Sequence, residues 1–246
     1  MIKSKLVWIS VLLVSITLIN LSFKMTDIIN QKPSLYYWVR TPKIKAGKPP
    51  LIILMHGVGS NEQNMFSFAS SLPGQFLVVS VRGPLILGQN SFAWFQVRFT
   101  PQGPVINQEQ AENSRKEILQ FIEDLKNVEY FDEKRVYLMG FSQGGIMSYS
   151  VALTAPEKIK GIAVMSGRLL TEVKPLTASK DRLKNLKIYV SHGTQDSVLK
   201  FQYALDAIAY LDSKGLNPEF HQYPEDHTIN QQMLDDVSVW FCKEKE

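Results

Sequence analysis

Apolar positions along the chain form short continuous runs that alternate with segments of helical spacing. Residues 51–56 and 76–81 are such runs, with almost no polar side chain inside them. Continuous apolar runs of this length are typical of strands covered on both faces, as in parallel sheets. Between the runs, apolar residues recur every three or four positions, for example at Ala111, Ile118 and Leu125. The alternation predicts an α/β fold with a mostly parallel sheet, helices on both faces and right-handed crossovers.

The expected elements follow from these runs and from the glycines and prolines that bound them. Strands are expected at residues 35–40, 51–56, 76–81, 136–139, 162–165, 188–191 and 219–223. Helices are expected at residues 61–72, 111–125, 144–153, 201–211 and 229–241.

Residues 83–107 break this rhythm and carry several prolines, glycines and aromatic side chains. A structureless loop of this length in a compact domain is usually a lid or a binding loop. We therefore expect an apolar cleft for an acyl chain here, with Trp94 and Phe95 as candidate substrate-binding residues. Ordinary packing against the sheet is an equally open interpretation, and the alternation of Phe95, Val97 and Phe99 also fits a short β-ribbon.

The amino terminus differs from the rest of the chain. Lys3 and Lys5 precede residues 6–23, which contain no charged side chain. As a helix this segment would span about 27 Å, close to the hydrocarbon thickness of a bilayer, and it is longer than a usual signal-peptide core. We expect residues 1–24 to be an uncleaved signal anchor, with a cleaved signal peptide as the alternative. Either would export the protein to the periplasm or another extracytoplasmic face, anchored or secreted. Residues 25–34 are then a linker to one domain at 35–246.

Length, charge and cysteine content limit the remaining possibilities. The 246 residues suit one large domain with a sizeable core. The net charge of +4 is small and scattered, so no nucleic-acid partner is expected. The single cysteine, Cys242, excludes an internal disulfide, and the spacing of a zinc site is absent. No metal or cofactor is expected, and the oligomeric state is left open.

A nucleophile motif follows the strand expected at residues 136–139. Residues 140–144 read Gly-Phe-Ser-Gln-Gly, and Gly145 comes next at the start of a helix. The G-x-S-x-G pattern between a strand and a helix is the nucleophile elbow, where small flanking residues permit a sharp turn. A glycine-rich helix start can also bind phosphate, but the lysine of a P-loop is missing. Ser142 is the candidate nucleophile.

A serine hydroxyl needs a base and a group that orients the base. Of the four histidines, His227 alone follows Ser142 and lies in a loop after the last strand. Asp196 follows another strand and is the candidate acid. Asp196 could instead cap the next helix, and Asp226 is the second choice as the acid. The order Ser, Asp, His along the chain is that of α/β-hydrolases.

Tetrahedral intermediates also need N–H donors for the developing oxyanion. The residue after the nucleophile, Gln143, is one candidate. The second is Val58, in the His-Gly-Val-Gly segment at residues 56–59 that follows an early strand.

These segments together resemble the phospholipase/carboxylesterase family, which includes acyl-protein thioesterases and small bacterial carboxylesterases. The resemblance is carried by residues 54–59, 140–145 and 192–196, the His227 loop and the aromatic stretch 93–95. It implies an α/β-hydrolase fold and cofactor-independent ester or thioester hydrolysis. The chain departs from the family pattern in having Asp226 before the histidine, where glycine is usual, and Gln96 after the aromatic stretch, where aspartate is common. The amino-terminal apolar segment is also not a family feature.

The sequence therefore predicts a serine carboxylesterase that acts on small or lipid-like esters through an acyl-enzyme on Ser142. The alternatives are an acyl-thioesterase or a lysophospholipase and, further off, a binding domain without catalysis. The carboxylate of Asp226 beside His227 suggests a further hypothesis, that it raises the pKa of the histidine.

Overall fold

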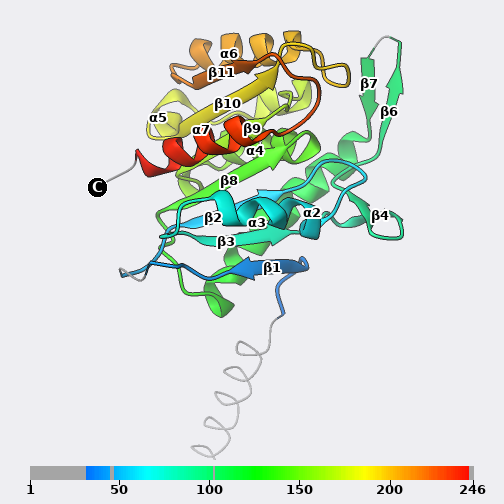
Figure 1. The fold of residues 1–246 in the computed structure, drawn as a ribbon. Helices are drawn as coiled ribbons and strands as arrows, with labels where there is room; N and C mark the ends of the chain where they lie inside the picture. Colours follow the sequence, from blue (N-terminus) through cyan, green and yellow to red (C-terminus); the bar gives the residue numbers. More distant parts are fainter. Residues whose placement is uncertain (1–31, 45–46, 102, 244–246) are drawn as a thin grey trace, which may run out of the picture.

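The computed structural model describes residues 32–44, 47–101 and 103–243, and in these ranges the chain folds around one twisted sheet (Figure 1). Seven strands of the described part form this sheet. The first strand pairs antiparallel with its neighbour and the other pairings are parallel, which confirms the predicted mostly parallel α/β architecture. In spatial order the strands are β1 (Tyr37–Arg40), β3 (Leu77–Val81), β2 (Leu51–Met55), β8 (Val136–Phe141), β9 (Gly161–Met165), β10 (Lys187–Gly193) and β11 (Glu219–Tyr223).

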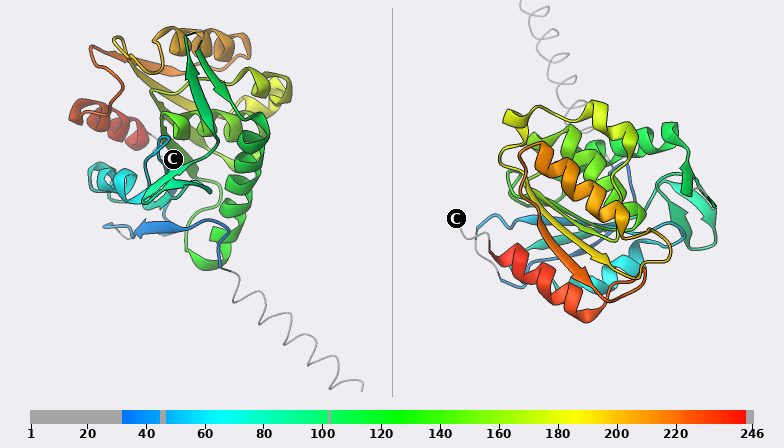
Figure 2. Two further views of the ribbon diagram at one scale, coloured as in Figure 1. Left: turned by 90° about the vertical axis from the view of Figure 1, so that its right-hand side faces the viewer. Right: turned by 90° about the horizontal axis from the view of Figure 1, so that it is seen from above.

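Helices cover both faces of the sheet, so the strands have two apolar sides (Figure 2). In β2 the side chains of Leu51 and Ile53 belong to one hydrophobic core and those of Ile52 and Leu54 to the other. This alternation explains why the strand is apolar throughout. The first core includes residues from α3 (Gln108–Val128), α4 (Gln143–Thr154) and α6 (Gln202–Ser213), and the second includes residues from α2 (Glu62–Phe66) and α7 (Gln231–Cys242).

The segment at residues 83–107 is not a structureless loop, and that expectation is wrong. It forms two antiparallel hairpins, and the pairing of Val97 with Ile106 confirms the alternative of a β-ribbon. Both hairpins lie at the carboxyl edge of the parallel strands, on the right in Figure 1 and facing the viewer in the left panel of Figure 2. Their strands are β4 (Leu85–Gly88), β5 (Ser91–Ala93), β6 (Val97–Thr100) and β7 (Gly103–Ile106).

Two further segments differ from the expected elements. The helix expected at residues 61–72 is α-helical only to Phe66 and continues as a 3₁₀ turn, Ser67–Ser71. Between β9 and β10 the chain makes a 3₁₀ helix, Thr171–Leu176, and a short helix α5, Lys180–Leu183, which the sequence pattern did not predict. Neither difference changes which strands meet at the carboxyl edge.

The predicted anchor and most of the predicted linker, residues 1–31, lie outside the described residues. None of the helices in the described part is both long and apolar enough to cross a bilayer.

Candidate active site

Ser142 occupies a sharp turn between β8 and α4, at the carboxyl edge of the sheet. Its backbone has φ 53° and ψ −114°, a strained conformation for a residue with a side chain. The turn is tight enough that a Cβ on Gly144 would lie 2.0 Å from the carbonyl oxygen of Met55. A Cβ on Gly140 would lie 2.2 Å from the carbonyl carbon of Gly144. Both glycines of the G-x-S-x-G motif are therefore required by space.

The structure brings the three side chains of the predicted triad together. The Nε2 atom of His227 lies 2.9 Å from the Oγ atom of Ser142, and its Nδ1 atom lies 2.7 Å from Oδ2 of Asp196. Since a carboxylate can only accept, Nδ1 carries the proton and Nε2 is free to accept the serine proton. Ser142 and Asp196 are each only 6% exposed. The arrangement can make the serine oxygen nucleophilic.

Asp196 is held as an ionised carboxylate by several donors. Its Oδ2 faces Nδ1 of His227, and its Oδ1 accepts the backbone N–H groups of Val198 at 3.0 Å and Leu199 at 2.7 Å. His192 Nε2 lies 3.2 Å from Oδ2 and 2.7 Å from the carbonyl oxygen of Leu199. Burial raises the pKa of this carboxyl, but the hydrogen bonds from His192, His227 and Leu199 outweigh it, so the pKa is lowered overall. The capping alternative is wrong, because α6 begins later, at Gln202, and has no side-chain cap.

The other histidines do not contact Ser142. His56 accepts the N–H of Gly83 at Nε2 (2.9 Å) and donates from Nδ1 to the carbonyl of Gly57 (2.7 Å). It therefore joins the end of β2 to the segment after β3, and burial lowers its pKa, so it stays neutral. His221 contacts Glu219 at the surface of β11. The choice of His227 from order and loop position agrees with this geometry.

The two predicted oxyanion donors face the same space. Val58 and Gln143 both line a pocket that contains Ser142. A Cβ on Gly57 would lie 3.3 Å from the Cβ of Ser142, which shows how closely the loop approaches the nucleophile. Among the described residues, no acceptor bonds the backbone N–H of Val58 or of Gln143. Both residues thus lie where the predicted oxyanion donors are needed, and their role stays a prediction.

The side chain of Gln143 fixes the aromatic stretch beside the nucleophile. Its Oε1 accepts the backbone N–H of Trp94 at 2.7 Å, and its Nε2 donates to the carbonyl of Phe95 at 2.7 Å. The indole of Trp94 is fully buried and donates to the carbonyl of His56 at 2.9 Å. Trp94 therefore supports the core and the oxyanion loop and is not a pocket residue, which corrects the expectation that it binds substrate. Phe95 does line the pocket.

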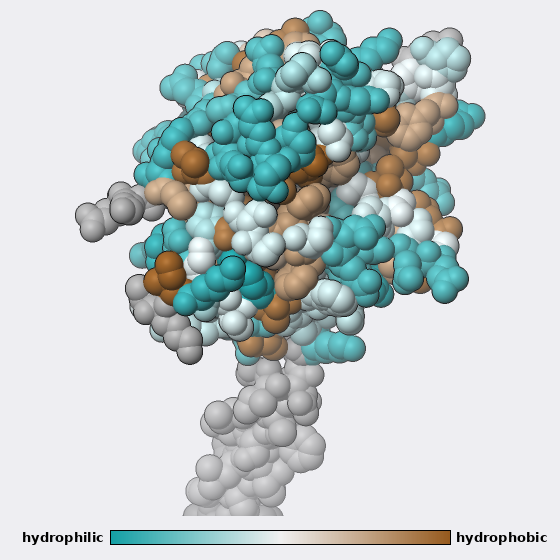
Figure 3. Space-filling view, in the orientation of Figure 1, coloured by the Kyte–Doolittle hydropathy of each residue, from teal (hydrophilic) through white to brown (hydrophobic). Residues whose placement is uncertain are grey.

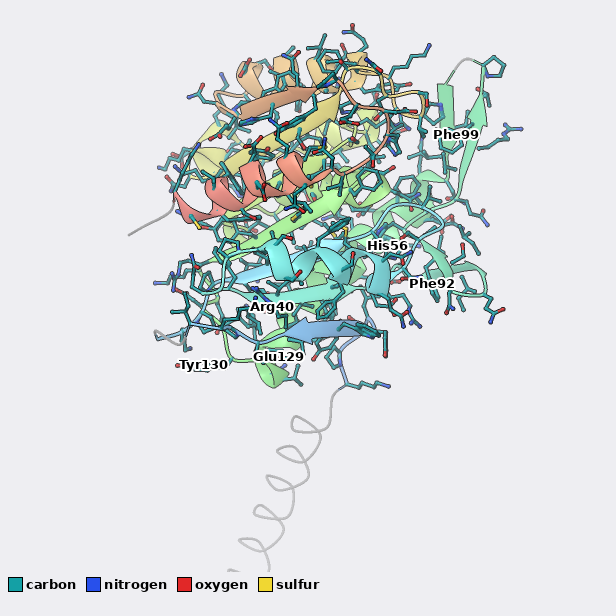
Figure 4. All side chains as sticks on the ribbon, in the orientation of Figure 1. Arg40, His56, Phe92, Phe99, Glu129 and Tyr130 are labelled. Carbon is teal, nitrogen blue, oxygen red and sulfur yellow. The ribbon has the colours of Figure 1, made fainter. Side chains whose placement is uncertain are left out.

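The pocket next to Ser142 is narrow and partly open to solvent, with a volume of about 20 Å³. It lies between the elbow and the second hairpin, whose exposed Phe99 is labelled in Figure 4. Sequence reasoning missed Ile146, Arg168 and Leu199 in its wall. Ile146 follows Ser142 by four positions, about one helical turn, and could have been found. Arg168 lies in an irregular stretch after β9 and carried no such signal. The full lining is Val58, Phe95, Val97, Phe99, Pro104, Ile106, Ser142, Gln143, Ile146, Arg168 and Leu199.

No group of three or more histidine, cysteine or carboxylate side chains is arranged to hold a metal ion within the ranges that the structure describes.

Comparison with known proteins identifies the family of the chain. A model of the phospholipase/carboxylesterase family matches residues 39–243. The chain belongs to the phospholipase/carboxylesterase family. It is thus a member of a family of hydrolases with the α/β-hydrolase fold, as the resemblance predicted.

Individual relatives are distant. Acyl-protein thioesterase 1 of Mycosarcoma maydis is 32% identical over 45% of this chain and 48% of its own length. Carboxylesterase SOBER1 of Arabidopsis thaliana is 28% identical over 60% of this chain and 66% of its own length. The chain thus spans about half to two thirds of these two relatives. Among solved structures, esterase PE8 superposes with a TM-score of 0.73 at 24% identity, covering 85% of this chain and 98% of that one, which bears on the fold alone.

Proposed function

We propose that this protein is a serine carboxylesterase that cleaves small or lipid-like esters through an acyl-enzyme on Ser142. The observation that carries the proposal is the continuous hydrogen-bonded series from Ser142 through His227 to Asp196, at 2.9 Å and 2.7 Å. A base within hydrogen-bond reach of a serine, itself oriented by a buried carboxylate, is the arrangement needed for nucleophilic catalysis.

In the first step the Oγ atom of Ser142 attacks the ester carbonyl while its proton moves to Nε2 of His227. The oxyanion that forms accepts hydrogen bonds from the backbone N–H groups of Val58 and Gln143. Asp196 stabilises the imidazolium without taking its proton. His227 then protonates the leaving alcohol, the C–O bond breaks and the acyl group stays on Ser142.

In the second step water attacks the acyl-enzyme. His227 Nε2, neutral again after giving its proton to the alcohol, removes a proton from the water. The same two N–H groups stabilise the second oxyanion. Collapse releases the carboxylic acid and returns the proton to Ser142, so the cycle needs no cofactor.

Acyl-thioester hydrolysis is the second candidate, because the same acyl transfer cleaves a thioester and several relatives are named acyl-protein thioesterases. The Cryptococcus neoformans acyl-protein thioesterase 1 is 25% identical over 78% of this chain and 91% of its own length. A lysophospholipase is a third candidate, supported only by the description of the family.

A fluorophosphonate probe and matched substrates test these proposals together. The wild-type protein should be labelled and should hydrolyse esters, whereas Ser142→Ala should lose labelling and reduce kcat by several orders of magnitude. Comparing kcat/KM for an oxoester, its thioester and a lysophosphatidylcholine ranks the three activities. Unchanged labelling in Ser142→Ala would place the reactive nucleophile elsewhere.

Residues 1–24 support a separate proposal about location. We propose that they target the domain to the extracytoplasmic face and hold it at the membrane, on the strength of the uncharged stretch at 6–23 after Lys3 and Lys5. Full-length protein should then sediment with membranes, and a form that begins at residue 25 should not. If both forms sediment with membranes to the same extent, residues 1–24 are not a membrane anchor.

A further inference from the structure

Arg168 is a charged residue in an otherwise mostly apolar pocket. It follows β9 at the carboxyl edge of the sheet, and it lines the same narrow space as Ser142 and Val58. The surrounding wall includes the aliphatic side chains of Ile146 and Leu199. The guanidinium is partly buried, and this burial lowers its pKa, although an arginine remains charged at any physiological pH.

The contacts of Arg168 leave most of its donors unused. Its guanidinium lies over the ring of Tyr203, 5.6 Å from the ring centre, and one N–H group lies 3.5 Å from the carbonyl oxygen of Pro104. That second distance is too long for a good hydrogen bond. Among the described residues no carboxylate forms an ion pair with Arg168, and Glu172 supplies only a weak, more distant attraction.

A partly desolvated cation without an anionic partner is unfavourable unless a ligand supplies the anion. The flat guanidinium offers a fork of N–H groups that matches the two oxygens of a carboxylate or of a phosphate. The ring of Tyr203 below the guanidinium restrains its position, so less freedom remains to be lost on binding.

We propose that Arg168 binds an anionic group of the substrate, a carboxylate or a phosphate near the scissile carbonyl, so that the enzyme prefers acidic esters. The inference rests on the ester hydrolysis proposed for Ser142 and specifies its substrate class. It makes Arg168 a specificity residue and not merely a support for the hairpin at Pro104.

The test uses two pairs of substrates that differ mainly in charge. Monomethyl glutarate carries a carboxylate on its acyl side, and methyl pentanoate is its neutral counterpart. In the second pair, 4-acetoxybenzoate carries the carboxylate on its alcohol side and 4-acetoxybenzamide is neutral. Wild-type, Arg168→Met and Arg168→Lys proteins are compared by the ratio of kcat/KM for the anionic ester to that for the neutral one. Arg98→Met removes an exposed arginine of the second hairpin and serves as the control.

In at least one pair the ratio should fall about tenfold or more in Arg168→Met, the size expected for loss of a charged hydrogen bond. Arg168→Lys should keep part of the preference because the charge stays and the fork is lost. Arg98→Met should leave the ratio within about twofold of wild type. The pair that responds identifies the side of the ester that carries the anion. Equal losses on charged and neutral esters, or unchanged ratios in both pairs, would overturn the proposal.

Glutarate and inorganic phosphate provide a readout that does not need turnover. Calorimetry measures the Kd of each anion for the Ser142→Ala variant and for the double variant Ser142→Ala, Arg168→Met. For at least one of the two anions the Kd should be about tenfold or more higher in the double variant. Equal binding of both anions with and without Arg168 counts against the inference even in a protein that hydrolyses nothing. Ser142-dependent hydrolysis with unchanged selectivity removes only the role of Arg168, whereas absence of all ester hydrolysis removes the proposed function.

Discussion

The carboxylate of Asp226 accepts hydrogen bonds from the backbone N–H and the hydroxyl of Ser197, at 2.7 Å and 2.8 Å. Ser197 follows Asp196, and Asp226 precedes His227, so the contact joins the acid loop to the histidine loop directly beside the triad. The same carboxylate accepts the backbone N–H of His227 at 2.7 Å. Asp226 is therefore turned toward the two backbones, and the orienting acid on the imidazole is Asp196.

Loss of the Asp226 contact should loosen the triad without abolishing it. We expect Asp226→Ala to lower kcat by about three- to tenfold, well short of the ~100-fold that a displacement of 1 Å can cost. Ser197→Ala, which keeps the backbone bond, should cost less. Steady-state kinetics on a neutral ester measure both. Asp235→Ala, at an exposed carboxylate that accepts a bond from Gln231 on α7, is the matched control.

The pH dependence separates this role from the hypothesis that Asp226 raises the pKa of His227. The bonds from Ser197 and from the backbone of His227 lower the pKa of Asp226 below its ordinary value of 3.8. The contact is thus complete above about pH 4 and is lost only as the pH falls through that lowered pKa. The activity ratio of Asp226→Ala to wild type should stay constant from pH 5 to 8. A less steep loss of activity by the variant at mildly acid pH would instead support the hypothesis.

His56 should make stability depend on pH. Burial lowers its pKa, against smaller raising effects from the carbonyl of Gly57 and from Glu62 and a lowering effect from Arg82. The unfolded chain then binds the proton more readily, so this contribution to the free energy of unfolding is full above about pH 6.5 and declines as the pH falls toward the folded pKa. Tm measured from pH 7.5 to 5 should fall less steeply in His56→Gln than in wild type.

His56→Gln should also lower kcat/KM, because the bonds of His56 to Gly57 and Gly83 fix the start of the proposed oxyanion loop. His56 is labelled in Figure 4. His221→Gln, at a partly exposed histidine, is the control for the pH series. Parallel Tm curves for wild type and His56→Gln would show that His56 does not contribute to the acid sensitivity.

An ion pair between a buried carboxylate and a partly exposed arginine holds the helix that follows this loop. Glu62 is fully buried and receives two bonds from Arg82, at 2.7 Å and 2.6 Å. Arg82→Met should lower the free energy of unfolding by about 3–5 kcal/mol, because it leaves a buried carboxylate unpaired. The exposed pair of Arg182 and Glu157 has the same 2.6 Å separation, and Arg182→Met should cost at most about 1 kcal/mol. Urea unfolding of both variants tests the contrast, and equal losses would contradict it.

The sequence was most informative where a residue's role depends on local spacing. The G-x-S-x-G turn, the strand before it and the order Ser142, Asp196, His227 are local or topological signals, and the three side chains that they single out lie together in the structure. The hairpins at residues 85–106 depend on pairings between segments rich in glycine and proline, whose register no periodicity reveals. The prediction for Trp94 is wrong because an aromatic residue in an irregular stretch can face either a pocket or the core. In the structure its indole N–H donates to the backbone carbonyl of His56, which places the ring in the core.

The same limit applies to Arg168 and to the exposed apolar side chains of the hairpins. Ile86 and Phe99 are 77% and 54% exposed, and apolar surface gathers on the side of the molecule where the hairpins lie (Figure 3). Tertiary packing decides which side chain of a hairpin faces the nucleophile, and the spacing of residues in one sequence does not reveal that packing.

The narrow pocket predicts a preference for short acyl groups, which limits the apolar acyl cleft expected from the aromatic residues. The partly open pocket beside Ser142 has a volume of only about 20 Å³, and each methylene that does not fit can cost about 1–3 kcal/mol. We expect kcat/KM for p-nitrophenyl esters to fall at least about tenfold from butyrate to octanoate. Ile146→Ala enlarges the wall and should raise the octanoate-to-butyrate ratio, whereas Val151→Ala, buried in the same helix but outside the pocket, should leave it unchanged. Octanoate cleaved as fast as butyrate by the wild type would mean that the hairpin at Phe99 moves aside to admit the chain.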